Sequence, residues 1–297
     1  KSWTLYHKII EESMEHPQRQ YLILVPEQFT MQTQKDLVAM HPRGGIMNID
    51  VVSFERLAFR VMEEVGEDMG QVLEETGKSL VLRKVAQKKK KELKVLKEQI
   101  KKPGYIAQLK STVSEFTQYH VGPEDMERML RAVEEKPQLY YKLRDIQILY
   151  QGFMDYLRGT YITAEQVLEM LSRVIWKWQR LEDCVVVLDG FTGFTPVQYR
   201  LLEEIFPRAG KVYAVITLDE KEDPYSPGSP HKLFFMSKQT VHRLLQIARR
   251  TRTEVEKEIC IRRGGKGRFV HSPALAYLEQ NIFRYGSRPY PGKQEEI

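Results

Sequence analysis

The sequence predicts an α/β fold in which a large all-helical insertion interrupts a parallel sheet. Two continuous apolar runs, Tyr21–Val25 and Cys184–Leu188, are typical of strands buried on both faces of such a sheet. Helical patterns separate these runs from other short apolar segments, and parallel strands need such crossovers. Between Leu73 and Glu182, helical patterns instead follow one another without a convincing strand.

The first part of the chain predicts the order helix, strand, helix, strand, helix. The apolar residues of the first helix recur at helical spacing and stop before His16-Pro17. The strand Tyr21–Val25 follows, closed by Pro26. After a second helix, Ile49–Val52 gives a short strand, and Ser53 is placed to cap a third helix. This order implies that the strands pair in parallel.

The middle of the chain predicts only helices. They are expected at 79–100, 105–119, 123–135, 142–157 and 164–178, the last opened by a capping box at Thr163 and Gln166. At 297 residues the chain is long enough for two cores. We therefore expect a discontinuous α/β domain of residues 1–72 and 183–297, and a helical insertion domain of residues 73–182.

The α/β pattern resumes after the insertion. Thr195-Pro196 begins a helix that runs to about Phe206, with Gln198 completing a second capping box. Val212–Ile216 is the next strand. A polar loop at 219–230, a basic helix at 232–250 and an alternating strand at 255–261 are expected to follow.

Composition narrows the class of protein. Hydrophobic residues make up 42% of the chain and charged residues 29%, as in ordinary globular proteins. There is no signal-peptide pattern and no apolar run long enough to span a membrane, so a cytoplasmic location is expected. The two cysteines, Cys184 and Cys260, predict neither a disulfide framework nor a metal site. A net charge of +6 permits a polyanionic partner without requiring one.

The two ends of the sequence suggest part of a longer protein. The chain has no initiator methionine and begins at Lys1 inside an expected helix. It ends in the polar stretch 289–297. We therefore expect a fragment.

One acidic residue stands where a nucleotide-binding fold would hold a metal ion. Asp189 directly follows the buried strand Cys184–Leu188, which is the Walker-B arrangement for Mg²⁺. Helicase motors normally place a glutamate next, to position water, but here Gly190 follows. An aspartate after a strand also serves as a turn or cap residue, and that alternative stays open.

The start of the chain is compatible with the end of a phosphate-binding loop. In G-x-x-x-x-G-K-[ST] the lysine and the hydroxyl residue open the first helix, which is where Lys1 and Ser2 lie. The site would bind ATP through Lys1, Ser2 and Asp189, with Mg²⁺ at Ser2 and Asp189. The fold is then a helicase-like P-loop NTPase. Gly77-Lys78-Ser79 resembles the end of such a loop but is not expected to bind phosphate, because no apolar strand precedes it.

Aromatic and basic residues gather at the same expected sheet edge. Unpaired bases stack on aromatic rings, and arginine contacts phosphates or base edges, so these residues are candidates for binding single-stranded DNA. The alternative is that the phenylalanines belong to the core. The residues are Phe29, Phe54, Arg56, Phe59, Phe191 and Phe194. The lysine run 88–91 and the pair Trp176 and Trp178 are more typical of a solvated helical face and of packing.

Four segments, in order, resemble the AddB (RexB) subunit of bacterial ATP-dependent helicase/deoxyribonucleases. They are Leu24-Val-Pro-Glu-Gln-Phe-Thr30, Val52-Ser-Phe-Glu-Arg-Leu-Ala-Phe-Arg-Val61, Thr76-Gly-Lys-Ser-Leu-Val-Leu-Arg83 and Leu188-Asp-Gly-Phe-Thr-Gly-Phe-Thr-Pro196. The resemblance covers nearly the whole chain and implies the amino-terminal, helicase-like region of that subunit.

The resemblance carries further expectations. It implies an AddA-type helicase/nuclease subunit as partner in a heterodimer that resects double-strand DNA ends for recombinational repair. It places a RecB-like nuclease domain with an iron–sulfur cluster outside these residues, in a carboxyl-terminal part. The region itself would scan single-stranded DNA for a Chi-type hotspot without being a motor. The matching candidates for that contact are Gln28, Thr30, Phe54, Arg56, Phe59 and Phe191.

Two alternatives remain open at this point. The first is an active ATPase or helicase domain with an unconventional catalytic acid supplied from elsewhere. The second is an assembly scaffold with no DNA contact of its own, which would show no salt-dependent affinity for single-stranded DNA.

Overall fold

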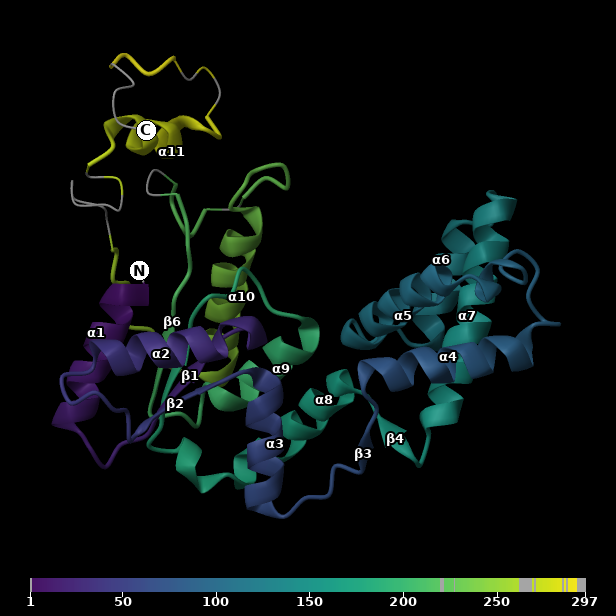
Figure 1. The fold of residues 1–297 in the computed structure, drawn as a ribbon, viewed down its shortest axis with the longest axis horizontal. Helices are drawn as coiled ribbons and strands as arrows, with labels where there is room; N and C mark the ends of the chain where they lie inside the picture. The colour runs from purple at the N-terminus through teal and green to yellow at the C-terminus, as the bar shows by residue number, and fades with distance from the viewer. Residues whose placement is uncertain are drawn as a thin grey trace.

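A computed structural model describes residues 2–219, 222–226, 228–261, 269, 271–284, 286 and 288–292. Its body is built on a four-stranded parallel sheet of order β2-β1-β5-β6 (Figure 1). The strands are β1 (Tyr21–Leu24), β2 (Ile49–Val52), β5 (Val185–Leu188) and β6 (Lys211–Ala214). The α/β fold and the parallel sheet expected from the sequence are confirmed.

Helices cover both faces of the sheet. On one face α1 (Ser2–Glu15) and α2 (Thr30–Met40) pack against Tyr21 and Ile23 of β1 and Val187 of β5. On the other face Leu22 and Leu24 contribute to the larger core, which α3 (Phe54–Val65), α9 (Pro196–Ile205) and α10 (Phe235–Thr251) complete. Both central strands are fully buried, which accounts for their continuous apolar sequences.

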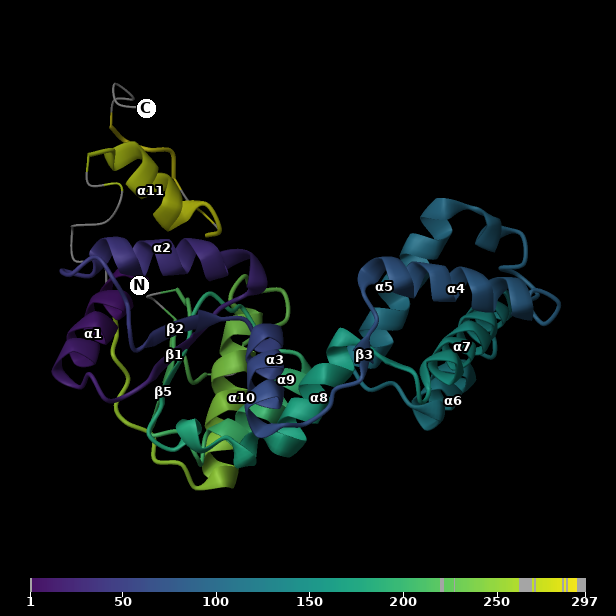
Figure 2. The same ribbon diagram turned by 60° about the horizontal axis from the view of Figure 1, so that its bottom comes forward.

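A separate helical lobe stands beside this body (Figures 1 and 2). It consists of α4 (Glu75–Lys89), α5 (Pro103–Gln118), α6 (Pro123–Ala132) and α7 (Pro137–Leu157), and most of it packs around its own apolar core. The chain enters the lobe through β3 (Gln71–Val72) and leaves it through β4 (Tyr161–Ile162). These two segments pair in parallel as a short ribbon. The expectation of no strand in this region missed β4.

The next helix, α8 (Ala164–Val174), packs with the body. Its Val167 and Leu171 are fully buried in the core that covers the sheet, and the helix lies against α3 and α9. Two short 3-10 helices, η3 (Ile175–Lys177) and η4 (Gln179–Leu181), connect it to β5. The domain boundary expected at residue 182 stays a prediction, and this packing argues for a boundary near Thr163.

One predicted helix is shorter than expected. The helix expected at 79–100 ends at Lys89 as α4, and only the 3-10 helix η2 (Gln99–Lys101) follows before α5. The reason is a tertiary contact: the carboxylate of Asp145 in α7 accepts hydrogen bonds from the backbone N–H groups of residues 94–96, at 2.8–3.1 Å. Asp145 is 1% exposed and holds this segment out of the helix.

The strand expected at 255–261 does not form. These residues are exposed and carry no strand pairing, and Lys211 of β6 contacts the segment only through its side chain, 2.7 Å from Glu256. Alternation predicts a strand only when one face is buried, and the side chains of residues 255–261 are all exposed.

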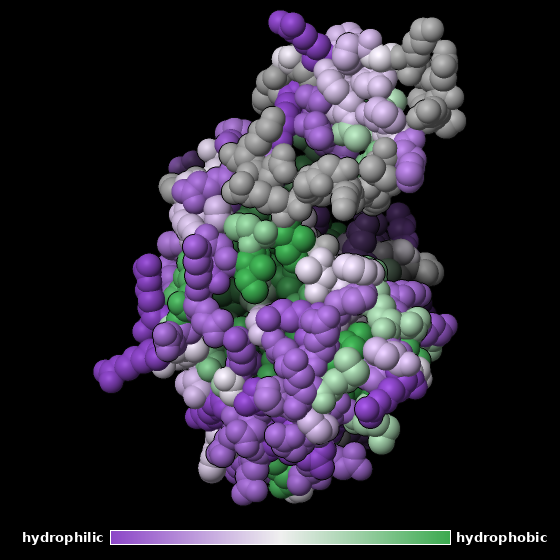
Figure 3. Space-filling model, turned by 90° about the vertical axis from the view of Figure 1, so that its left-hand side faces the viewer, coloured by the Kyte–Doolittle hydropathy of each residue, from purple (hydrophilic) through white to green (hydrophobic). Residues whose placement is uncertain are grey.

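A further helix, α11 (Pro273–Asn281), lies above the body in Figure 1. The Arg284 guanidinium that follows it contacts both oxygens of Asp219, beyond β6, at 2.9 Å. Seen from the side of α1, apolar surface shows between the body and the part of the chain that carries α11 (Figure 3). Within the described residues, the helices are too short or too polar to cross a membrane.

Candidate nucleic-acid interface and nucleotide site

The carboxyl ends of three neighbouring strands lie level at one edge of the sheet. Leu24, the last residue of β1, is in register with Val52 of β2 and with Leu188 of β5. The segments that follow, 25–30, 53–56 and 189–194, therefore meet at this edge, where open α/β sheets bind their ligands. Gln28, Thr30, Arg56, Asp189 and Phe191 all belong to these segments.

Asp189 is buried at this edge and tied to two other elements. It is 2% exposed, and its backbone N–H donates to the Leu24 carbonyl oxygen at 3.0 Å. Its Oδ2 accepts a hydrogen bond from the Tyr6 hydroxyl of α1 at 2.9 Å. Burial, and to a smaller extent the Asp189 charge, raise the pKa of Tyr6 to about 12. Tyr6 therefore remains a donor at neutral pH.

Two of the predicted nucleotide-binding residues, Ser2 and Asp189, lie at or near this contact. Ser2 begins α1, one turn before Tyr6, so the helix start and the end of β5 face the same edge. Lys1 lies outside the described residues. A magnesium ion takes one or two carboxylates together with phosphate oxygens. An ion bound at Asp189 would share the carboxylate with the Tyr6 hydroxyl, which donates to its Oδ2. In the part of the chain that the structure describes, no three acidic, histidine or cysteine side chains gather as a metal site.

The backbone at Gly190 explains why no glutamate follows Asp189. Gly190 has φ +81°, in the left-handed region that side chains rarely adopt. A Cβ atom there would lie 3.3 Å from Cδ of Pro26 and 3.8 Å from the Phe29 ring. A longer side chain at this position, such as the glutamate expected there in helicase motors, is thus disfavoured both by the backbone conformation and by the close approach of Pro26.

The segment after β1 forms a cavity that contains three of the predicted DNA-binding residues. This β1-edge cavity, of about 270 Å³, is lined by Glu27, Gln28, Thr30, Met31, Gln34 and Arg56. Nε of Arg56 lies 3.0 Å from Oε1 of Glu27, with both side chains more than half exposed. The Thr30 hydroxyl donates to the Glu27 carbonyl oxygen at 2.9 Å and is buried. Sequence reasoning pointed to the segment that begins at Glu27, just after β1, but missed Gln34.

At the same edge of the sheet lies a cluster of three phenylalanine rings. The centroid of Phe191 is 4.8 Å from that of Phe194 and 5.5 Å from that of Phe54. Phe54 is only 4% exposed and belongs to the core. Phe191 and Phe194 are half-buried against the same core. Phe54 is therefore placed to support the Phe191–Phe194 loop, and its direct contact with DNA stays a prediction.

Other aromatic and apolar side chains near this edge are open to solvent. Phe59, one turn along α3 from Arg56, is 39% exposed. Phe29 is 48% exposed and Met31 is 68% exposed, both close to the β1-edge cavity. Such side chains offer flat or apolar surfaces to unpaired bases.

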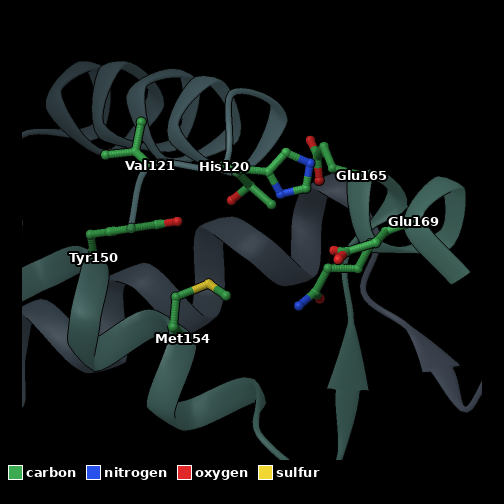
Figure 4. Close-up of a pocket in the computed structure, with 8 residues that line it drawn as sticks. His120, Val121, Tyr150, Met154, Glu165 and Glu169 are labelled. Carbon is green, nitrogen blue, oxygen red and sulfur yellow. The ribbon is translucent and has the colours of Figure 1, made fainter. Parts of the chain in front are cut away.

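A second cavity, of about 190 Å³, lies at the joint between the lobe and the body. Figure 4 shows His120 from the end of α5, Tyr150 and Met154 from α7, and Glu165 and Glu169 from α8 around it. His120 has φ 53°, an uncommon conformation for a residue other than glycine. Burial and then the Arg200 charge lower the pKa of its imidazole.

The segment Gly77-Lys78-Ser79, which the sequence analysis did not expect to bind phosphate, has a structural role. Lys78 lies within α4 rather than in a loop and is 2% exposed. Its Nζ is 2.9 Å from Glu75 and 3.2 Å from Glu165 of α8, so the lysine ties the lobe to the body beside the second cavity.

Comparison with known proteins identifies the family. The family model described as "ADDB, N-terminal" matches residues 1–279. Similar curated proteins are named as the B subunit of an ATP-dependent helicase/deoxyribonuclease. The one from Lachnoclostridium phytofermentans is 41% identical over all of this chain and 26% of its own length. The one from Caldanaerobacter subterraneus subsp. tengcongensis is 34% identical over 98% of this chain and 24% of its own length.

The chain thus spans about a quarter of the length of the curated relatives that it matches. The match falls on the amino-terminal part by the description of the family model. The order of the four sequence motifs and these comparisons point to the same family, and the parallel sheet fits the fold expected from the sequence. The chain belongs to the AddB family, as its amino-terminal region.

Proposed function

We propose that this region holds single-stranded DNA at the carboxyl edge of its sheet and is not itself a motor. The whole protein would be the B subunit of an ATP-dependent helicase/nuclease that resects double-strand breaks in the cytoplasm, with an AddA-type subunit as partner. A helicase-like P-loop NTPase fold is part of the same proposal. The names of the relatives support it.

One observation carries the DNA-holding role: the β1-edge cavity and the Phe191–Phe194 loop follow neighbouring strands that end in register at one edge of the sheet. Gln28 and Arg56 offer hydrogen-bond donors in the cavity, and Phe191 offers a ring at the same edge. Amide and guanidinium groups read base edges, while rings stack on bases without regard to sequence. A Chi-type hotspot could be distinguished by such a combination of fixed polar contacts and a stacking surface.

Single substitutions in the intact complex test the role. Phe191→Ala should weaken binding of single-stranded DNA by about 1–3 kcal/mol and abolish the response to a hotspot sequence, while nuclease activity is kept. Trp176→Ala is the matched control, because this tryptophan is 59% exposed but lies in η3, before β5, and not in the segments that follow the strands. Equal effects of the two substitutions would contradict the proposal.

Arg56→Ala tests the cavity, with Arg60→Ala as its control on the same helix. Arg60 pairs with Asp50 of β2 at 2.8 Å and does not line the cavity. Arg56→Ala should lower the discrimination between hotspot and scrambled strands, whereas Arg60→Ala should leave it unchanged. A hotspot response that survives Arg56→Ala would show that the cavity does not read bases.

A second candidate function is nucleotide binding without hydrolysis. Ser2 at the start of α1 and Asp189 at the end of β5 support it, with Lys1 as the expected phosphate ligand. The left-handed backbone of Gly190 leaves no room for the usual water-positioning acid. ATP with Mg²⁺ should therefore bind the intact subunit without turnover. Steady turnover in the absence of the partner, abolished by Lys1→Ala, would support an active ATPase instead.

A further inference from the structure

A chain of aromatic rings leads from the proposed DNA edge to an exposed arginine. The Phe194 ring lies 5.5 Å from the Tyr199 ring of α9, centroid to centroid, in an edge-on arrangement. The guanidinium of Arg243 on α10 then lies 5.0 Å from the Tyr199 centroid. Arg243 is exposed, so this cation–π contact holds its charged group at the surface beside the Phe191–Phe194 loop.

The charge of Arg243 is not balanced by a carboxylate in the part of the chain that the structure describes. By contrast, Arg250, two turns along α10, lies 3.1 Å from Glu203, and Arg56 lies 3.0 Å from Glu27. The residue of α9 that contacts the Arg243 guanidinium is Tyr199, which supplies a ring and not a carboxylate. A guanidinium held in place but left charged is suited to bind a phosphate.

The same face of α10 is fixed against the Phe191–Phe194 loop. The Thr240 hydroxyl is buried and lies 3.3 Å from the Thr192 carbonyl oxygen. A Cβ atom on Gly193 would lie 3.8 Å from the end of Met236, which is 62% exposed. Met236, Thr240 and Arg243 follow the i, i+4, i+7 spacing of one helical face. The loop and Arg243 therefore belong to one continuous surface.

We propose that Arg243 binds a backbone phosphate of the strand whose bases lie at Phe191, so that the DNA path continues onto α10. This inference rests on the proposed function and adds a sequence-independent contact to it. Contacts to phosphates set the register and the affinity of a strand, while base contacts set its specificity. Arg243 should therefore act equally on hotspot and scrambled DNA.

The salt dependence of affinity tests the contact. With the intact complex and a scrambled single-stranded oligonucleotide, the logarithm of affinity is measured against the logarithm of salt concentration. Each phosphate contact contributes about 0.7 to the slope for single strands. Arg243→Gln should reduce the slope by about 0.7, and Arg243→Lys should keep most of it because the charge remains. Arg250→Gln is the control, since Glu203 already balances that arginine.

The supporting ring gives a second test. Tyr199→Phe keeps the ring under the guanidinium, whereas Tyr199→Leu removes it. Tyr199→Leu should weaken binding of both DNAs, and Tyr199→Phe should not. An unchanged slope in Arg243→Gln, or an equal loss in Arg250→Gln, would overturn the inference.

The two proposals fail in different ways. If the wild-type complex bound single-stranded DNA with no contribution from this region, Phe191→Ala would have no effect, and the proposed function would fall. If Phe191→Ala weakened binding while Arg243→Gln left the slope unchanged, only the assignment of Arg243 would fall.

Discussion

The hydroxyl of Tyr6 donates a 2.9 Å hydrogen bond to Oδ2 of Asp189 across the buried contact between the first helix and the strand that ends at the proposed DNA loop. The two residues are 5% and 2% exposed. Asp189 is two residues before Phe191, so this hydrogen bond joins the start of the chain to the aromatic loop.

Loss of this bond should cost stability. Tyr6→Phe keeps the ring but removes the donor from a buried carboxylate, and such a loss typically costs about 1–3 kcal/mol. Denaturant unfolding of the intact subunit measures it as a lower midpoint. Tyr199→Phe is the control, because its hydroxyl makes only a long contact, 3.4 Å from Thr240 Oγ1. If Tyr6→Phe unfolded at the same denaturant concentration as Tyr199→Phe, the Tyr6 hydroxyl would not contribute to stability in this way.

The buried pair between Lys78 and Glu165 should hold the lobe to the body. Their side chains are 3% and 10% exposed, so Lys78→Met leaves a buried carboxylate without its cation, at a cost of about 3–5 kcal/mol. Limited proteolysis should then cut faster near β3 and β4. Adding Glu165→Gln to Lys78→Met should restore part of the resistance.

A matched control for Lys78 lies on the same helix. Lys89 pairs with Glu92 at 2.9 Å, but its side chain is 36% exposed, so Lys89→Met should cost under about 1 kcal/mol. If proteolysis near β3 and β4 were equally fast in both variants, the pair at the joint would not be what holds the lobe.

His120 should make the lobe–body joint sensitive to acid. Burial lowers the pKa of its imidazole in the folded protein below the ordinary 6.5. On acidification the unfolded chain then takes up a proton before the folded one does, so stability falls as the pH drops through about 6.5. Unfolding free energies measured about one pH unit above and about one pH unit below this value would show the loss.

A variant separates the imidazole of His120 from its backbone strain. Asparagine tolerates the left-handed conformation at φ 53° but does not titrate in this range. His120→Asn should fold and should lose part of the acid sensitivity. An unchanged pH dependence in this variant would assign the effect to other groups.

The core support of the aromatic loop gives a further prediction. Phe54 is 4% exposed beneath Phe191, so Phe54→Ala should cost about 3–5 kcal/mol in unfolding free energy, as for a core phenylalanine. Phe59→Ala, on the same helix but 39% exposed, should cost much less stability. Comparable melting temperatures for the two variants would contradict the core placement of Phe54.

The sequence predicted those features that depend on local pattern. Continuous apolar runs identified β1 and β5, and the parallel order placed Gln28, Arg56 and Asp189 at one edge. Features that depend on distant contacts could not be found in this way. The contact between Tyr6 and Asp189 joins residues 183 positions apart, and Tyr6 otherwise resembles any other residue on a buried helical face.

Two predictions from the sequence, the helix at 79–100 and the strand at 255–261, were wrong because they too depend on contacts with distant residues. The break after α4 depends on Asp145, about 50 residues away in the sequence, whose carboxylate competes with helix formation for the backbone N–H groups of residues 94–96. The strand expected at 255–261 had the alternation of a strand but no surface to cover. The burial of Phe54 likewise depends on how α3 meets the loop after β5.

Gly190 also bears on how this family could have changed over time. A single codon change to glutamate would meet both a left-handed backbone and the proline that ends the neighbouring strand. The ends of β1 and β5 would have to be rebuilt together before an acid could stand there. Stepwise mutation toward an acid directly after Asp189 would therefore pass through less stable intermediates, which favours retention of glycine at this position.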